Sequence, residues 1–281
     1  MTTQQIIYKI LSQLRADLGD NLISIYGIGS YFDTTLPSGW LKNDIDIISM
    51  VKSINNIPKE YWETRFKTRR IHGYEVFFGY NTVLAYHDKN IFHEISGANY
   101  EWSLIEMKHP ENSILLHGVD IRDQLPDTAN ISFDFDDLLA RGLYHIEKSF
   151  QSGTKYEAKK EFSKAIFKTA FYFCLFFDNS FRSTSITMIK EKLKKISPQN
   201  KNLIKAMTFL KEAILYRING KYSSNVEEIR EEFLLWLVSL LEKGMLHRVM
   251  SNDLLIRYMS KNFRGFPRII QKVRGYQKDS L

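Results

Sequence analysis

Cysteine is almost absent from this sequence: Cys174 is the only one among 281 residues. A single cysteine cannot form an internal disulfide, and it excludes a zinc site built from four cysteines. Cys174 lies in the apolar run 171–177, so the sequence predicts a buried thiol rather than a nucleophile. The 7 histidines show no HxxxH or related spacing, which argues against a zinc site built from histidine.

Long hydrophobic runs are also missing. The longest apolar stretch covers residues 165–177, contains Lys168, and is shorter than a helix that crosses a bilayer. Residues 1–5 are mostly polar and do not have the character of a secretory signal. We therefore expect a cytoplasmic protein that does not associate with a membrane.

Proline and glycine are scarce, with 6 and 14 residues, and the sequence contains neither an internal repeat nor a low-complexity segment. Apolar material is abundant instead, because 44% of the residues are hydrophobic and 14% are aromatic. This composition is typical of a folded protein with one or two packed cores. A length of 281 residues favours two domains, and the polar segment 124–132 gives domains 1–125 and 126–281.

Positive charge exceeds negative charge, giving a formal net charge of +7. A nucleotide, an RNA or an acidic protein would each match this excess, while a solvated tail is the simpler interpretation. Charge alone therefore does not choose a function. Much of the excess lies near the C-terminus, at Lys261, Arg264, Arg268, Lys272, Arg274 and Lys278.

The first hundred residues alternate between helix and strand patterns. Apolar residues in 5–18 follow helical spacing, and a glycine and turn formers end that segment. Strand patterns follow at 22–26, 44–50 and 74–78, with a helix expected around 59–67. This alternation predicts a sheet domain of the α/β or α+β class.

After about residue 135 the strand pattern stops and only helical patterns continue. The sequence therefore predicts an all-α, C-terminal helical bundle without a sheet. Its clearest helices are expected at 162–177, 186–196, 202–216 and 226–241.

Two aspartates open the second expected strand. In a strand, residues two apart point to the same face, so Asp44 and Asp46 present both carboxylates to one side. Ile45 and Ile47 then face the core on the other side. Two close carboxylates repel each other unless a cation lies between them, and Mg²⁺ prefers such oxygen ligands. The pair therefore predicts a magnesium site.

Three further residues complete this candidate site. Glu75 is polar in the middle of the apolar strand 74–78 and is the natural third carboxylate, with Glu94 and Glu101 as weaker alternatives. Upstream, Gly29 allows close approach of the backbone to a phosphate, and Ser30 can donate hydrogen bonds to it. Carboxylates that hold one or two Mg²⁺ ions beside a phosphate fit an in-line displacement at phosphorus.

At this point the sequence resembles the DNA polymerase β-type nucleotidyltransferase superfamily, and most closely its aminoglycoside-modifying, kanamycin nucleotidyltransferase-like branch. The resemblance covers residues 5–125 and fades beyond them. One departure is that Tyr31 and Phe32 follow the Gly-Ser pair, where the family often has small residues and arginine. The matching segments are LRADLGDNLISIYGIGS, Asp44-Ile45-Asp46-Ile47, Gly73-Tyr74-Glu75-Val76-Phe77, Glu101-Trp102-Ser103-Leu104 and Ile114-Leu115-Leu116-His117-Gly118.

The resemblance implies an α+β fold, with an N-terminal mixed sheet flanked by helices and followed by the helical domain. It implies Asp44, Asp46 and Glu75 as catalytic residues and metal ligands, and Gly29 and Ser30 as nucleotide-binding residues. In two-domain members of the family, a lysine on an early helix of the second domain contacts the triphosphate. Lys160 and Lys164 lie four apart and are candidates, with Lys164 favoured, although such a row is also typical of a solvated helix face.

The predicted reaction is Mg²⁺-dependent transfer of a nucleoside monophosphate from an NTP, most simply ATP, to a hydroxyl of an acceptor. A small molecule such as an aminoglycoside is the favoured acceptor. Two alternatives stay open: a toxin–antitoxin enzyme that modifies tRNA or protein, and a binding module of the same fold that uses the basic C-terminal tail. The sequence fits a monomer and a homodimer equally well.

Overall fold

A computed structural model describes residues 2–42, 44–65, 67–96, 98–133 and 135–242, together with Gln271. The basic C-terminal residues that the sequence singled out, and the binding module built on them, lie outside these ranges. The chain divides into two compact units, which we call the sheet unit and the helical unit. The sheet unit comprises Met1–Pro37, Lys42–Phe133 and Arg182–Thr187, and the helical unit comprises Ser38–Leu41, Asp134–Phe181 and Met188–Leu281.

The main passage between the units lies after Phe133, eight residues beyond the boundary expected from the polar segment. The segment before it packs within the sheet unit, because the Arg182 side chain donates a hydrogen bond to the carbonyl of Thr128. The Arg182 guanidinium also lies 4.6 Å from the centre of the Phe133 ring. Each unit therefore includes a short segment that is distant in sequence from the rest of it.

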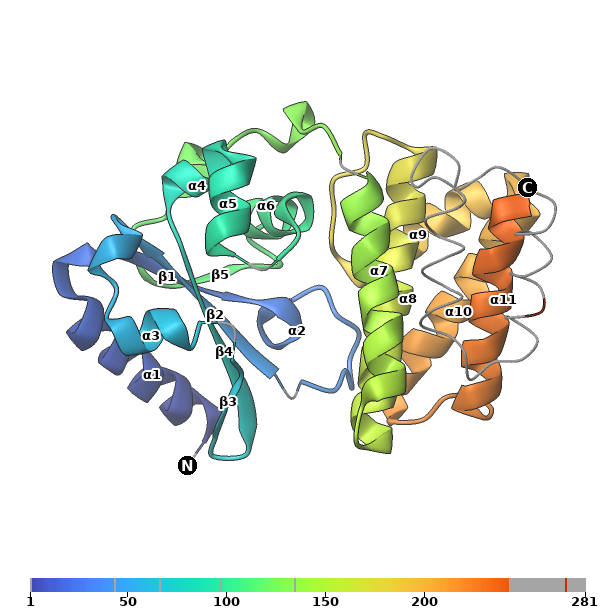
Figure 1. The fold of residues 1–281 in the computed structure, drawn as a ribbon, viewed down its shortest axis with the longest axis horizontal. Helices are drawn as coiled ribbons and strands as arrows, with labels where there is room; N and C mark the ends of the chain where they lie inside the picture. Colours follow the sequence, from blue (N-terminus) through green and yellow to red (C-terminus); the bar gives the residue numbers. More distant parts are fainter. Residues whose placement is uncertain are drawn as a thin grey trace. The chain divides into compact units, whose positions relative to one another are not determined.

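The sheet unit is built around a five-stranded sheet with the order β3-β4-β2-β1-β5 (Figure 1). Strands β2 and β4 run parallel and the other neighbouring pairs run antiparallel, so the sheet is mixed, as expected. The strands are β1 (Leu22–Ile28), β2 (Asp44–Val51), β3 (Arg69–Ile71), β4 (Tyr74–Asn81) and β5 (Ile114–Gly118).

Helices cover both faces of this sheet. Residues of one face, such as Ile45 and Val76, pack in a core with the apolar side of α1 (Thr3–Leu18). Residues of the other face, such as Tyr26 and Met50, pack in a second core with later helices. The remaining helices of the sheet unit are α2 (Gly29–Phe32), α3 (Lys59–Glu63), α4 (Val83–His87), α5 (Lys89–Ile95) and α6 (Tyr100–Lys108).

Local sequence signals explain the limits of α1. The Thr2 hydroxyl and the Gln5 side chain form a capping box at its start, which satisfies amides that have no partner within the helix. At its end, Gly19 adopts a φ of 48°, a conformation that glycine tolerates best. The helix predicted at 5–18 is thereby confirmed.

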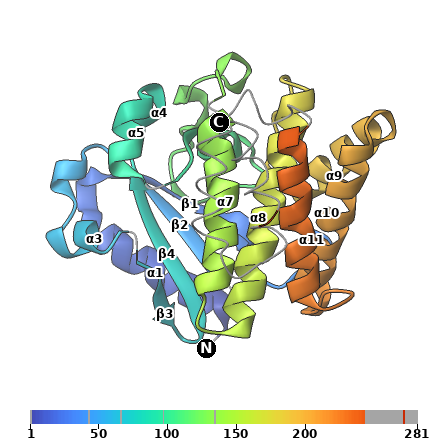
Figure 2. The same cartoon turned by 45° about the vertical axis from the view of Figure 1, so that its right-hand side comes forward.

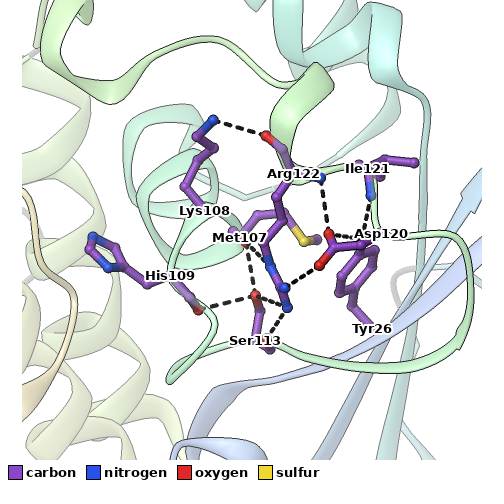
Figure 3. A network of polar contacts seen from close by, with 8 residues as sticks. All are labelled: Tyr26, Met107, Lys108, His109, Ser113, Asp120, Ile121 and Arg122. Carbon is purple, nitrogen blue, oxygen red and sulfur yellow. Dashed lines mark hydrogen bonds and ion pairs between the residues drawn. The ribbon is translucent and has the colours of Figure 1, made fainter.

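A partly buried polar network ties α6 and the segments on either side of β5 to β1 (Figure 3). The Arg122 side chain, 15% exposed, forms an ion pair with Asp120 at 2.6 Å and donates to the carbonyls of Met107 and Ser113. Met107 lies in the last turn of α6, where carbonyls have no partner within the helix. Tyr26 of β1 donates to the Asp120 carboxylate at 2.9 Å and accepts the amide of Ile121.

Replacement of Arg122 by methionine is therefore expected to lower the free energy of unfolding by about 2–4 kcal/mol, because the Ser113 carbonyl would lose its partner, the Met107 carbonyl would keep only the Ser113 hydroxyl, and Asp120 would lose its ion pair. Urea denaturation would measure the change. The matched control is the same substitution at Arg15, an exposed residue of α1, which should shift stability by less than about 0.5 kcal/mol. Equal stability of the two variants would contradict a structural role for the network.

In the part of the helical unit that the structure describes, helices pack around α8 (Figure 2). Most of α8 is buried, and it packs against α7 and α10. Cys174 lies in this core, where burial raises the pKa of its thiol, so the expectation of a buried cysteine is confirmed. The helices are α7 (Phe135–Gln151), α8 (Lys155–Phe177), α9 (Ile186–Ile196), α10 (Lys201–Asn219) and α11 (Val226–Glu242).

Among the helices in the described ranges, none has the length and apolar character that crossing a bilayer requires.

Candidate functional site

Three neighbouring strands bring the residues singled out by the sequence to one end of the sheet. Strands β2 and β4 begin there, with Asp44 directly opposite Glu75 in the parallel register. Strand β1 ends there, because it runs antiparallel to β2 and pairs Ile28 with Asp46. The glycine-serine turn after β1 therefore lies beside the two aspartates.

The two-residue period of β2 separates its carboxylates from the core, as predicted. Ile45 and Ile47 are fully buried in the core beneath α1. Asp44 and Asp46 are half-buried and belong to the opposite face of the strand. Glu75 shares that face, because partners in a parallel register point to the same side.

Gly29 lies against the carboxylate of Asp46. A Cβ atom added to Gly29 would lie 2.6 Å from Oδ2 of Asp46, a distance that real Cβ atoms do not show. Gly29 also has a φ of 71°, in the region that disfavours residues with a side chain. Position 29 therefore requires glycine, and Ser30 follows it directly as the second residue of α2.

The first glycine of the motif has a different partner. A Cβ atom on Gly27 would lie 2.6 Å from the ring of Phe32, which is nearly buried in the core beneath α1. The Tyr31 ring packs edge-on against Phe32, with 5.0 Å between the ring centres. Tyr31 and Phe32, the two aromatic residues that depart from the family pattern, thus pack together, and Phe32 lies between Gly27 and the core that the sheet shares with α1.

The loop between α2 and β2 is held by contacts that the sequence analysis missed. One Asp33 carboxylate oxygen accepts the amide and the hydroxyl of Thr35, at 2.7 and 2.6 Å. Residues of the segment 182–187 then bind Thr35 from outside: its hydroxyl lies 2.7 Å from that of Ser185, and its carbonyl accepts from Thr187 at 2.9 Å. The Asp-x-Thr pattern was the available signal for the local turn.

The carboxylates of Asp44 and Asp46 suit Mg²⁺ better than they suit a metal ion that is coordinated by protein side chains alone. Within the described ranges, no three His, Cys, Asp or Glu side chains form a group that could hold a metal ion. Mg²⁺ usually keeps several waters and binds one or two carboxylates together with substrate phosphates. Asp44 and Asp46 supply such a pair on one face of β2, so they fit that ion. The role of Glu75 as a third ligand stays a prediction.

The alternative third acids occupy other positions in the sheet unit. Glu101 is fully buried and forms an ion pair with Lys89 at 2.6 Å, and it also accepts from Asn99 at 2.8 Å. These contacts give Glu101 a structural role within α6. Glu94 is exposed on α5. Of the three candidate acids, Glu75 is the one that pairs with Asp44 in the sheet.

The two candidate lysines belong to α8 of the helical unit. Lys160 is 4% exposed, so the lysine row is not a uniformly solvated face. Lys164 lies with its ammonium 3.4 Å from the Glu161 carboxylate, whose other oxygen is 2.8 Å from Nδ1 of His145. The role of Lys160 and Lys164 as triphosphate contacts stays a prediction.

The contacts among Glu161, Lys164 and His145 lead us to expect that the folded protein loses stability in acid. Burial alone would raise the pKa of Glu161, but the hydrogen bond from His145 and the charge of Lys164 together lower that pKa to about 2. In the unfolded chain the pKa of Glu161 is near 4.5. The stabilisation of the folded state by the Glu161 carboxylate is therefore fully present above pH 4.5 and is lost as the pH falls toward 2. Burial lowers the pKa of His145 below 6.5, so its contribution is also lost on acidification.

Glu161→Gln should remove the stabilisation that the Glu161 carboxylate provides, about 3 kcal/mol at neutral pH by the size of its pKa shift. The difference in unfolding free energy between wild type and variant should shrink between pH 4.5 and the lowest accessible pH. Urea titrations across that range would measure it, with Glu191→Gln on the exposed side of α9 as the control. If the difference in unfolding free energy between wild type and Glu161→Gln did not change with pH, the lowered pKa of Glu161 would be contradicted.

Comparison with known proteins identifies the fold. No protein-family model matches the sequence, and neither does any curated protein. Solved structures do match, among them the spectinomycin adenyltransferase AAD(9) from Enterococcus faecialis, crystallised with ATP and spectinomycin. That likeness has a TM-score of 0.52 at 13% sequence identity and covers 84% of this chain and 98% of that one. The α+β fold expected from the sequence is thereby confirmed.

Proposed function

We propose that this protein is a nucleotidyltransferase that transfers a nucleoside monophosphate from an NTP to a hydroxyl of an acceptor and releases pyrophosphate. The observation that carries the proposal is the backbone of Gly29 packed against the Asp46 carboxylate, beside the register pair Asp44–Glu75. A phosphate-binding turn and a carboxylate pair at one sheet end suit a metal-bound triphosphate. The shared fold of an adenyltransferase crystallised with ATP supports this reading.

In this proposal Asp44 and Asp46 hold Mg²⁺. The ion, when bound, offsets the negative charge that develops on the phosphate oxygens in the transition state. Ser30 donates hydrogen bonds from its hydroxyl and amide to a phosphate of the nucleotide. Because Gly29 has no side chain, the backbone of this turn can lie directly against the Asp46 carboxylate, and Ser30 is thereby held beside the proposed metal ligands.

Glu75 accepts the proton of the attacking hydroxyl. The acceptor oxygen forms a bond to the α-phosphorus, the bond from that phosphorus to the bridging oxygen of the β-phosphate breaks, and pyrophosphate leaves with the electron pair. A carboxylate beside Asp44 is well placed for this role, since general bases must lie within hydrogen-bond reach of the proton they take. Lys164, with Lys160 as second candidate, contacts the triphosphate.

The favoured acceptor is a small molecule with several hydroxyls, such as an aminoglycoside, and the favoured nucleotide is ATP. The structural neighbour was crystallised with ATP and a small acceptor, spectinomycin, which supports this class. Modification of tRNA or protein is the alternative acceptor class.

The test is a panel of the four NTPs with Mg²⁺, in which pyrophosphate release is measured against pooled aminoglycosides, tRNA and protein. Release with one nucleotide and small acceptors is the expected result. Nucleotide adducts on tRNA or protein, detected by mass spectrometry after expression, would move the acceptor to the alternative class. Absence of release with every acceptor would overturn the proposed activity.

A further inference from the structure

Four residues of the loop between Ser30 and Asp44 belong to the helical unit. The chain leaves the sheet unit after Pro37, contributes Ser38–Leu41 to the helical unit, and returns at Lys42. Strand β2 begins two residues later with Asp44. The segment Ser38–Leu41, which we call the loop tip, is therefore close in sequence to a proposed metal ligand.

The aromatic side chain of the loop tip is buried in the helical unit. Trp40 is 7% exposed and its ring lies 5.6 Å from the ring of Phe167 in α8. The guanidinium of Arg217 in α10 lies 5.5 Å from the indole centre, within the range of a cation–π contact. Two helices of the helical unit thus contribute contacts to one residue of the loop.

Backbone contacts fix the loop tip further. The amide of Leu41 donates to the carbonyl of Arg217 at 2.7 Å, and the Arg217 side chain donates to the carbonyl of Leu41 at 3.2 Å. Arg217 lies in the last turn of α10, so the loop provides a partner for a carbonyl that the helix itself leaves unsatisfied. Gly39 has a φ of 81°, and an added Cβ would lie 3.3 Å from Ile218.

The other parts of the same loop are fixed within the sheet unit. Thr35 is bound by Ser185 and Thr187, as described above. The Lys42 ammonium donates to the carbonyl of Tyr31 at 3.2 Å and thereby links the two ends of the loop. The loop thus has separate attachments at its base and at its tip.

The indole of Trp40 is not the best choice for stability alone. Its Nε1–H group is buried and has no hydrogen-bond partner among the described residues. A buried donor of this kind costs free energy, and phenylalanine would fill most of the space without that cost. Burial of Trp40 therefore anchors the loop tip by ring packing rather than by a polar contact.

We propose that Trp40 is a positioning residue for the candidate site: its packing on Phe167 and Arg217 anchors the loop tip, which lies close in sequence to Asp44. The inference rests on the proposed function of that site. Trp40 does not touch the nucleotide in this scheme. It acts through Leu41 and Lys42, the residues that lead into β2.

The experiment compares Trp40→Ala with Trp40→Phe and with Phe209→Ala. Phe209 is a buried aromatic residue of α10 that packs on Phe233 and Trp236, so its loss weakens the same unit without touching the loop. Trp40→Ala should raise the KM for the nucleotide roughly 10-fold and lower kcat up to about 100-fold, the scale expected for small misplacements. Trp40→Phe should keep both constants within about 2-fold of wild type, since the ring packing is retained.

A merely structural role would give a different pattern. Loss of folded enzyme lowers the apparent kcat and leaves KM unchanged, and Phe209→Ala should show this behaviour. An unchanged nucleotide KM in folded Trp40→Ala would overturn the proposal.

Amide hydrogen exchange tests the anchoring without turnover. Trp40→Ala should speed exchange at Leu41 and at the first residues of β2, whereas Phe209→Ala should not. If the wild-type protein transfers no nucleotide, the proposed function fails, and the exchange pattern still decides whether Trp40 fixes the chain into β2. Exchange at β2 that is equal in Trp40→Ala and wild type would overturn the inference.

Discussion

Asp46→Asn is expected to lower kcat/KM for nucleotidyl transfer by roughly 10³-fold or more, because the substitution removes one negative charge from the proposed metal-binding pair. Asparagine has nearly the same size, and Asp46 lies half-buried near the start of β2, so the fold should persist. Pyrophosphate release at several Mg²⁺ concentrations would measure the loss. The thermal unfolding midpoint, recorded on the same sample, would show that the variant is folded.

Asp20→Asn is the control for this prediction, because Asp20 is exposed in the short turn that follows α1 in the same unit. It should leave kcat/KM within about 2-fold of wild type. Full activity of Asp46→Asn would sink the metal-site assignment. Activity restored by high Mg²⁺ would instead locate the defect in ion affinity, as the proposal requires.

Gly29→Ala is expected to cost both stability and activity. The new Cβ would meet Oδ2 of Asp46 at 2.6 Å, and alanine at a φ of 71° is strained. We expect a loss of about 1–3 kcal/mol in unfolding free energy from the strained backbone. Displacement of the Asp46 carboxylate should reduce kcat/KM about 100-fold, since catalysis depends on its position. Denaturant titration and pyrophosphate release would measure the two effects.

Gly220→Ala separates the effect of backbone strain from the effect of displacing the Asp46 carboxylate. Gly220 ends α10 with the same φ of 71°, but an added Cβ would meet nothing within 4 Å. The control should therefore lose stability from backbone strain and keep the kinetic constants of the folded enzyme. Equal activity in both variants would show that the contact between Gly29 and Asp46 has no part in catalysis.

The carboxylate arrangement could be predicted because it depends on a local period. Alternation along β2 is a property of any strand, so Asp44 and Asp46 share a face wherever the strand pairs. The position of Glu75 needed one further fact, the parallel register between β2 and β4, which local pattern does not supply. The sequence and the resemblance gave Glu75 as the expected third carboxylate, and the structure pairs it with Asp44 across these strands.

Other parts of the sheet unit were not predicted because their signals are short. Strand β3 has three residues, and the helices α4, α5 and α6 were not expected from the sequence. Their starts are marked by capping residues, Thr82, Asp88 and Asn99, whose side chains accept amides of the first turns. The helix expected at 59–67 ends at Glu63, because Thr64 leaves the helical conformation.

The environment of the loop tip could not be read from sequence at all. Trp40 lies in a polar loop, and its partners Phe167 and Arg217 follow more than a hundred residues later. Burial of Lys160 in α8 is similar, since a lysine row at helical spacing usually marks a solvated face. Both features depend on tertiary packing, which local periodicity does not contain.

The segment 182–187 has a consequence for the order of events during synthesis. The last strand of the sheet, β5, ends at Gly118, but the partners of Thr35 emerge only after α7 and α8 have been made. Domains generally fold as units while the chain grows, the N-terminal one first. Here the nascent sheet unit is still incomplete when its last strand leaves the ribosome. A chain that stalls before residue 182 therefore carries all five strands and both aspartates, but the loop between α2 and β2 still lacks its contacts with Ser185, Thr187 and Arg217.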